Sequence, residues 1–294
     1  MITAAMVKEL REMTGCGMMD CKKALTEADG NMDNAIELLR KKGLAAAEKK
    51  AGRIAAEGIV SDYVDGNVGV IIEVNSETDF VAKNADFQAF VKGVAKVVCE
   101  QDPADVAALL QLKYDDANTV EEALREKILT IGENMIIRRF ARFEGPVATY
   151  IHGGGKIGVM VKAESSLEGT AFEAARDAAM QICALNPRYL DKSTVPEADL
   201  AKEKEILAAQ LKNDPKNANK PDAILEKIVM GRIGKFYDNY CLNQQEFFKN
   251  DQLTVGEYLA QNGVKIIDYV RFEKGEGLEK KEDNFADEVA SMIK

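Results

Sequence analysis

Apolar side chains recur at helical spacing through the first forty residues of the chain. Three stripes have this spacing: Ile2, Met6, Leu10 and Met13; Met18, Cys21, Leu25 and Ala28; and Met32, Ala35, Ile36 and Leu39. A glycine follows each stripe, at Gly15, Gly30 and Gly43, where a left-handed helix end favours glycine. The pattern predicts a head of three short helices over residues 1–43, followed by an Ala- and Lys-rich linker over residues 44–56.

Beyond residue 56 the pattern changes to alternation and then repeats itself. The run EGIVSDY at 57–63 recurs as EGPVATY at 144–150, and each copy passes through a glycine turn into a second alternating strand. Each copy then continues into helical stripes, a T-V-x-E-x-L run and a strand that ends in R-F-E. We therefore expect an α+β protein whose core is duplicated, with halves at 57–143 and 144–275. Each half should hold a three-stranded antiparallel sheet and helices.

The second half is longer than the first, and its extra length falls at about 190–235. Two apolar stripes flank a polar turn there, which predicts a helical-hairpin arm projecting from the core. After the second half, residues 276–294 are expected to form a C-terminal helical module. Its amphipathic stripe consists of Phe285, Val289, Met292 and Ile293.

The net charge of the chain limits the classes of partner that it can bind. The chain has 294 residues and a formal net charge of −10, which disfavours a general binder of nucleic acids or anionic membranes. Positive charge gathers locally between Arg40 and Arg53, where the only acidic residue is Glu48. This cluster is either a solvated helix end with its linker or a docking patch for an acidic partner, and the sequence favours the first interpretation.

The content of histidine and cysteine excludes most catalytic chemistry. His152 is the only histidine, so a metal site with several histidines cannot form, and no phosphate-loop or nucleophile-elbow motif is present. The glycine run beside His152 reads as a hairpin turn. Five cysteines without C-x-x-C spacing indicate reduced thiols, and early charges interrupt any signal peptide. These features predict a cytoplasmic protein that needs no metal or cofactor and is not a conventional enzyme.

One polar loop between a strand and a helix contains an aromatic residue. It reads NSETDFVAKN over 75–84, and the second half has no counterpart to its Asp-Phe pair. Phe80 could simply pack on its own core while Asn84 caps the next helix, and local sequence favours that interpretation. The alternative is that Phe80 contacts a partner.

Longer motifs support the alternative. The runs TGCGMMDCKKAL at 14–25, TDFVAK at 78–83 and IGEN at 131–134, in this order, resemble the bacterial elongation factor Ts family over essentially the whole chain. The resemblance implies a head similar to a ubiquitin-associated (UBA) domain. It also implies guanine-nucleotide exchange on elongation factor Tu: the factor binds Tu in its GDP-bound and nucleotide-free forms, dislodges Mg²⁺ and promotes release of GDP.

The resemblance also assigns roles to individual residues. The segment implied in Mg²⁺ dislocation from the partner is Thr78, Asp79, Phe80 and Val81. The implied contacts with the partner are Lys8, Leu10, Arg11, Met18, Met19, Gly132, Asn134 and His152. Since Met18 shares a stripe with Cys21 and Leu25, we expect Met19 to be the more exposed of the two methionines. No direct contact with nucleic acid or membrane is implied, and the arm could form a homodimer or a heterotetramer.

Two hypotheses from other classes remain. A non-catalytic adaptor would use the UBA-like head to bind proteins without affecting nucleotide release. A nucleic-acid-associated factor would act through the Arg40–Arg53 cluster, and its binding would weaken steeply with added salt.

Overall fold

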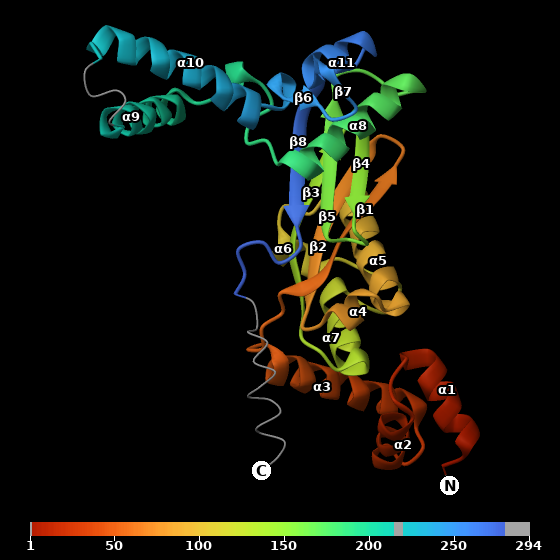
Figure 1. The fold of residues 1–294 in the computed structure, drawn as a ribbon. Coiled ribbons are helices and arrows are strands. Elements are labelled where there is room, and N and C mark those ends of the chain that lie inside the picture. Colours follow the sequence, from red (N-terminus) through yellow and green to blue (C-terminus); the bar gives the residue numbers. More distant parts are fainter. Residues whose placement is uncertain (1, 215–219, 280–294) are drawn as a thin grey trace.

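The computed structural model describes residues 2–214 and 220–279. The molecule is elongated, with the helical head at one end and the arm at the other (Figure 1). Between them lies the duplicated α+β core, so the predicted fold class is confirmed. The predicted tail helix at Phe285, Val289, Met292 and Ile293 lies outside the described residues. The likeness of the head to a UBA domain stays a prediction.

The head consists of three helices around a small apolar core. They are α1 (Ala4–Thr14), α2 (Met18–Glu27) and α3 (Met32–Lys50). Leu10, Cys21 and Leu25 are fully buried among them, because their stripes face inward.

The third helix corrects two predictions. We expected it to end at Gly43 and a linker to follow, but α3 continues to Lys50, so 44–50 is helical. The Ala- and Lys-rich segment has strong helix propensity. Gly43 lies in the helix interior, where a Cβ would meet Arg125 O at 3.6 Å and the Leu129 side chain at 3.8 Å. These are ordinary van der Waals distances, and α3 runs past Gly43 along α7 (Val120–Ile131) without ending there.

The first half of the core is a three-stranded antiparallel sheet with helices on one face. The strands, in the order β1-β2-β3, are β1 (Glu57–Asp65), β2 (Val68–Ser76) and β3 (Met135–Glu144). The helices are α4 (Asp79–Ala82), α5 (Ala85–Gln101), α6 (Val106–Gln111) and α7 (Val120–Ile131). Val70 and Ile72 pack on Phe87, Phe90 and Val94 of α5 in one buried cluster.

The second half repeats this arrangement in the order β4-β5-β8. Its elements are β4 (Val147–His152), β5 (Ile157–Ala163), α8 (Thr170–Leu185), β6 (Glu246–Phe247), β7 (Asn250–Thr254), α11 (Val255–Gln261) and β8 (Ile266–Glu273). The repeat extends to backbone irregularities. The register shifts after Glu73 in the first half and after Lys162 in the second, at corresponding positions.

Helix caps show how closely the halves correspond. Thr119 and Thr254 begin α7 and α11 with complete capping boxes, and both belong to the repeated T-V-x-E-x-L run. The T-x-x-E spacing of Thr170 and Glu173 predicts a further capping box, but none forms at the start of α8. Gly169 takes the N-cap position of α8, so Thr170 lies one residue inside the helix.

The two sheets pack face to face. Val60 and Ile71 of the first half meet Val147, Met160 and Phe272 of the second in a buried cluster between the sheets. The other face of the first sheet packs on α5, and the other face of the second packs on α8. The core is therefore a four-layer stack of helix, sheet, sheet and helix.

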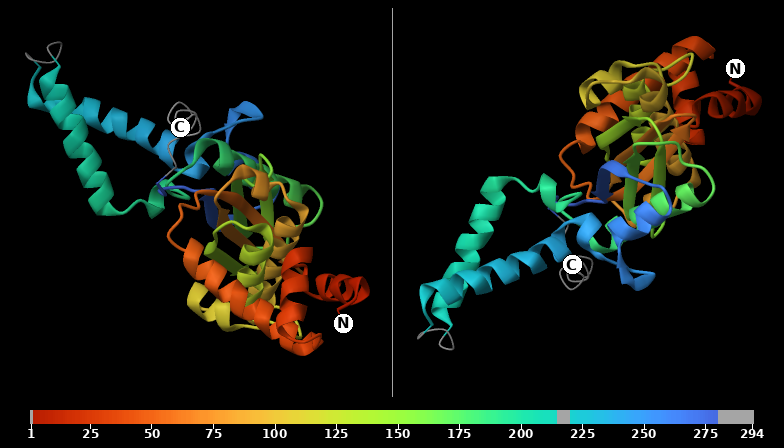
Figure 2. Two further views of the ribbon diagram at one scale, coloured as in Figure 1. Left: turned by 90° about the horizontal axis from the view of Figure 1, so that it is seen from below. Right: turned by 90° about the horizontal axis from the view of Figure 1, so that it is seen from above.

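The predicted helical hairpin leaves the second half between α8 and β6. It consists of α9 (Glu197–Asn213) and α10 (Asp222–Tyr240), flanked by the short helices η1 (Lys192–Thr194) and η3 (Leu242–Gln244). Leu207, Leu211 and Ile233 are buried between the two arm helices. Both views in Figure 2 show the arm projecting away from the sheets.

Candidate functional site

Phe80 is the most exposed large hydrophobic side chain among the described residues, with 80% of its surface accessible. It lies in the one-turn helix α4, next to Val81 and Ala82, which are buried in the core of the first half. Because successive helical residues point about 100° apart, burial of these two directs Phe80 outward. The prediction that Asn84 caps α5 is confirmed, whereas packing of Phe80 on its own core is wrong.

Thr78 anchors the start of this turn. Its backbone N–H donates to Oε2 of Glu133 at 3.0 Å, and its hydroxyl donates to Oε1 of the same carboxylate at 2.6 Å. The Thr78 carbonyl accepts from the Ser76 hydroxyl at 3.0 Å, and its Oγ1 also caps α4 at Val81 N. Thr78 is therefore held through its N–H, its carbonyl and its hydroxyl, directly before Asp79 and Phe80.

Asp79 is exposed and pairs with Lys83 one turn later. The two charged groups are 2.6 Å apart, and the Lys83 ammonium lies 5.9 Å from the centre of the Phe80 ring. The hydrogen bond from Lys83 lowers the pKa of Asp79, and the positive charge of Lys274 acts in the same direction. Asp79 is thus a carboxylate at neutral pH, and it presents negative charge beside an exposed aromatic ring.

Gly132 and Asn134 lie in the turn between α7 and β3, and they have structural roles. Gly132 ends α7 in the left-handed region, at φ 90°. Asn134 is buried, its N–H donates to Glu77 Oε1 at 2.6 Å, and its side-chain amide donates to the Arg53 carbonyl at 2.8 Å. The turn therefore links the loop before Phe80 to the connection that leads from the head.

The head residues divide into exposed and buried ones. Lys8 and Arg11 are exposed on α1, and Lys8 pairs with Glu12. Met18 and Met19 begin α2 and are 56% and 63% exposed, so Met19 is the more exposed of the two, as predicted, although the Met18 side chain is exposed as well. Leu10 is fully buried, so its side chain supports the head rather than facing solvent.

His152 ends β4 beside the glycine turn, as predicted. Its side chain is exposed, and Nδ1 lies 3.0 Å from the Tyr150 hydroxyl. The turn carries it on the second half, whereas Phe80 belongs to the first. The predicted site residues thus occupy the head, the first half and the second half of the core instead of converging on one cavity.

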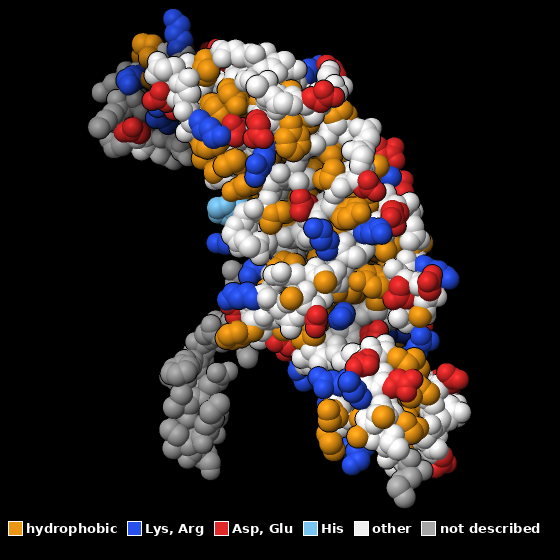
Figure 3. Space-filling model, turned by 90° about the vertical axis from the view of Figure 1, so that its right-hand side faces the viewer, with side chains coloured by type: hydrophobic (Ala, Val, Ile, Leu, Met, Phe, Trp, Pro, Cys, Tyr) orange, Lys and Arg blue, Asp and Glu red, His pale blue; other side chains and the backbone are white. Residues whose placement is uncertain are grey.

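Several of the positive charges between Arg40 and Arg53 are used within the chain. Arg40 donates to the Asn118 side chain at 3.1 Å, Lys50 Nζ donates to the Ile128 carbonyl at 3.4 Å, and Arg53 lies 3.4 Å from Glu77. On the face drawn in Figure 3, Lys and Arg side chains are mixed with Asp and Glu over most of the surface. These contacts fix α3 to the core. They favour a structural role for the cluster over a docking patch for an acidic partner.

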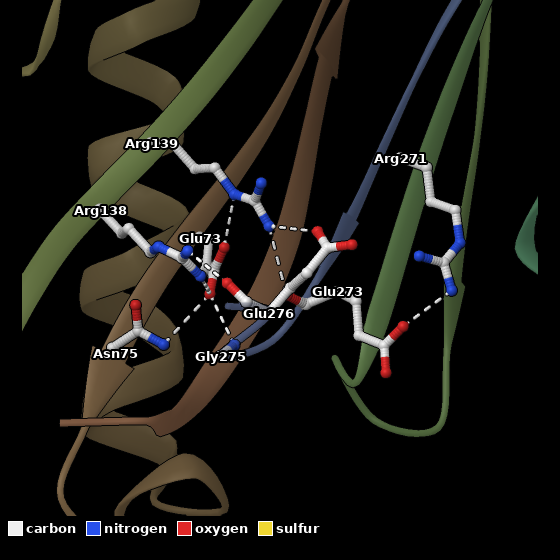
Figure 4. Close-up of polar contacts among 8 residues, drawn as sticks. All are labelled: Glu73, Asn75, Arg138, Arg139, Arg271, Glu273, Gly275 and Glu276. Atoms are coloured by element: carbon white, nitrogen blue, oxygen red, sulfur yellow. Dashed lines mark hydrogen bonds and ion pairs between the residues drawn. The ribbon is translucent and has the colours of Figure 1, made fainter. Parts of the chain in front are cut away.

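A buried carboxylate near the C-terminal end of the core escaped the sequence reasoning. Glu73 is fully buried on β2 and accepts from Arg139 Nε at 2.6 Å, Gly275 N at 2.8 Å and Arg138 at 3.0 Å (Figure 4). Burial raises the pKa of Glu73, but the hydrogen bonds from Gly275, Arg139 and Arg138 outweigh it, so the net pKa is lowered. A charged residue inside an otherwise apolar strand was the available signal.

This network secures the segment that follows β8. Arg139 also reaches the Glu273 carbonyl and the Glu276 carboxylate, and its guanidinium lies 4.3 Å from the centre of the Phe272 ring. Gly275 has φ 68°, and a Cβ there would collide with the Ala56 carbonyl. Residues 273–276 are therefore tied to the first half, at the place where the connection from the head enters it.

Neither a metal nor a membrane is indicated by the part of the chain that the structure describes. Within residues 2–214 and 220–279, no three His, Cys, Asp or Glu side chains are grouped as metal ligands. None of the helices in these ranges is long and apolar enough to span a bilayer. All five cysteines are free and buried. What the site offers is a projecting aromatic ring and exposed methionines, which are features of a protein contact surface.

Comparisons with known proteins agree with the motifs. The sequence model of the family described as "Elongation factor TS" matches residues 77–276. A protein named "Elongation factor Ts" from Clostridium kluyveri is 52% identical over 100% of this chain and 99% of its own length. Another of the same name, from Clostridioides difficile, is 48% identical over the same shares. The chain therefore belongs to the elongation factor Ts family of translation elongation factors.

Proposed function

We propose that the protein is a guanine-nucleotide exchange factor for elongation factor Tu, acting in the cytoplasm without covalent chemistry of its own. The observation that carries the proposal is Phe80, whose ring projects into solvent from a turn anchored by Glu133 on one side and buried Val81 on the other. An exposed aromatic ring in a fixed orientation can enter a partner without first paying the entropy of ordering its loop.

The target of such a ring follows from how a GTPase holds its nucleotide. Mg²⁺ and backbone N–H groups hold the phosphates, so a shift of these elements by an ångström or two removes much of the electrostatic binding. Phe80 and its flanking residues, Thr78, Asp79 and Val81, are proposed to displace these elements of Tu and thereby dislodge Mg²⁺. By linkage, nucleotide and exchange factor weaken each other's binding by the same factor.

Phe80 alone supplies too little free energy. Burial of one phenylalanine yields ~1.5–3 kcal/mol. A ten-thousand-fold acceleration of release needs about 5.5 kcal/mol of differential stabilisation. The balance requires further contacts, and the exposed residues Lys8, Arg11, Met18, Met19 and His152 are proposed to supply them. Leu10, Gly132 and Asn134 are proposed to support this surface from within.

The test is release of labelled GDP from purified elongation factor Tu. Wild-type protein should accelerate release strongly, and the double variant Asp79→Ala/Phe80→Ala much less. Phe172→Ala removes another partly exposed phenylalanine, on α8, and serves as the matched control that should retain wild-type activity.

Each contrary outcome has a distinct meaning. Equal acceleration by the wild type and the double variant would refute the role of Phe80. Binding of Tu without any effect on GDP release would favour the adaptor. Binding of RNA that weakens steeply with added salt would favour the nucleic-acid-associated factor. The arm's role in self-association stays a prediction.

A further inference from the structure

The loop that carries Phe80 and the turn between α7 and β3 each supply a carboxylate that accepts hydrogen bonds from the other. Glu133 accepts both the N–H and the hydroxyl of Thr78, at 3.0 and 2.6 Å. In return, Glu77 accepts the N–H of Asn134 at 2.6 Å. Two segments more than fifty residues apart are thus joined by reciprocal, charge-assisted hydrogen bonds, which are stronger and more directional than those between neutral groups.

We infer that Glu133 is a positioning residue for Phe80, an inference that rests on the proposed exchange function. Thr78 is the N-cap of α4, so its position fixes where the single turn begins. At the other end, Val81 and Ala82 are buried, and Gln88 Nε2 donates to the Ala82 carbonyl at 3.0 Å. Glu133 acts through Thr78 and holds the free end of the turn against this buried end.

A four-residue helix cannot hold this orientation by itself. Formation of a first helical turn is unfavourable, because several dihedral angles are fixed for one hydrogen bond. The cap bond from Val81 N to Thr78 Oγ1 is long, at 3.5 Å. Without Glu133, the N–H and hydroxyl of half-exposed Thr78 can turn to water. The turn then loses its register while the fold, which is anchored by Val81, is retained.

Loss of Glu133 should therefore lower the rate of GDP release from the complex more than it lowers the affinity of the protein for elongation factor Tu. Misplacement of an interacting group by about 1 Å can cost roughly a hundred-fold in rate. For Glu133→Ala, we expect the maximal rate of GDP release at saturating factor to fall about ten- to hundred-fold. The concentration that gives half of the maximal rate should change little, because the head and the second half still bind. Glu133→Gln, which keeps one acceptor, should be intermediate.

The same measurement includes a double-mutant cycle. If Glu133 acts only by placing Phe80, then Glu133→Ala should cost nothing further in a Phe80→Ala background. Glu121→Ala is the matched control, because Glu121 is a partly exposed glutamate in the first turn of α7 that pairs with Arg125, at the opposite end of this helix from Glu133. Wild-type maximal rates for Glu133→Ala, or a full additional loss in the Phe80→Ala background, would overturn the inference.

A second measurement needs no partner. The chain contains no tryptophan, so Phe80→Trp introduces a single reporter at the tip of the loop. Its fluorescence anisotropy should decay mainly with tumbling of the whole protein. Adding Glu133→Ala should increase the amplitude of nanosecond motion, with the thermal unfolding midpoint little changed. An unchanged decay would overturn the inference even if exchange activity is confirmed, whereas failure of the wild type to release GDP would overturn the proposed function.

Discussion

Thr149 donates a hydrogen bond from its hydroxyl to the Asp62 carboxylate, and the two residues occupy the same position in the two halves of the core. The apolar contact around them has the same symmetry. A Cβ on Gly69 would meet Val147 and Met160, and a Cβ on its counterpart Gly158 would meet Val60 and Ile71, which correspond to that pair. The halves therefore pack about a local two-fold axis, like the subunits of a symmetric dimer.

The glycines at this interface predict a large effect of a small substitution. Gly158→Ala places a methyl group against the stiff side chain of Val60, and at Gly69 the added Cβ would be 2.7 Å from Val147. Either variant should lose about 1–3 kcal/mol of stability, as overpacked cores do. Urea unfolding measures the loss. Gly52→Ala, where the added atom meets open space, should unfold as the wild type does.

In the arm, replacing glycine by alanine should increase stability instead of lowering it. Gly231 and Gly234 lie inside α10, and a Cβ at either position meets nothing within 4 Å. Alanine should therefore stabilise the arm helix by roughly 0.5–1 kcal/mol at each site. Amide hydrogen exchange in α10 should slow, while exchange in β2 stays unchanged. Faster exchange in α10 would show that these glycines serve another purpose.

Buried Glu73 predicts a stability difference that depends on pH. Glu73→Gln leaves Arg138 and Arg139 without their shared anion, and breaking a buried ion pair costs about 3–5 kcal/mol. Because the folded-state pKa of Glu73 is lowered from its ordinary 4.5, its stabilisation is present above that pH. The stabilisation is lost as the pH falls through the folded-state pKa.

The check is urea unfolding of wild type and Glu73→Gln at pH 7 and in acid. The gap between them should be large at neutral pH and should shrink below about pH 4.5. Glu144→Gln removes a carboxylate that is itself 68% exposed from its pair with Arg142, and it should cost less than ~1 kcal/mol. A gap that does not depend on pH would mean that packing, and not charge, accounts for the effect.

Glu126, where the head meets the core, should make stability depend on pH in the opposite direction to Glu73. It borders a cavity of about 220 Å³ between α3 and α7, and burial raises its pKa. A raised folded-state pKa stabilises the protein only below the unfolded value, and the benefit is lost as pH rises through the folded value. Glu126→Gln should therefore raise the unfolding midpoint at pH 7 and lose this advantage in acid. A lower midpoint at pH 7 would show that the carboxylate has a stabilising partner.

Periodicity predicted most of the fold because each element buries one face. The stripes of Leu10, Cys21 and Leu25 and the repeated T-V-x-E-x-L runs indicate helices that the structure contains. Gly43 predicts a helix end because a glycine after an apolar stripe usually ends a helix, whereas here α3 continues to Lys50 and packs along α7. That reason lies in tertiary packing, about eighty residues away, and local sequence does not contain it.

The candidate site was predictable in its residues but not in its support. The motif around Thr78, Asp79 and Phe80 was found, yet local pattern favoured Phe80 as a core residue. Its exposure depends on burial of Val81 and Ala82 and on Glu133, which reaches Thr78 from another part of the chain. Long-range carboxylate contacts of this kind leave no periodic trace in the sequence, and for Glu73 the signal is only a charged residue inside an otherwise apolar strand.

The unbroken course of α3 has a consequence for how a partner is met. Its 19 residues extend for about 28 Å from the head core to the surface of α7, with no flexible joint between them. Exposed Met19 and Phe80 are therefore held at a set separation before any partner arrives. If both side chains contact the partner, as proposed above, docking at one point brings the other into range at a high effective concentration, and little conformational freedom remains to be lost at the second contact.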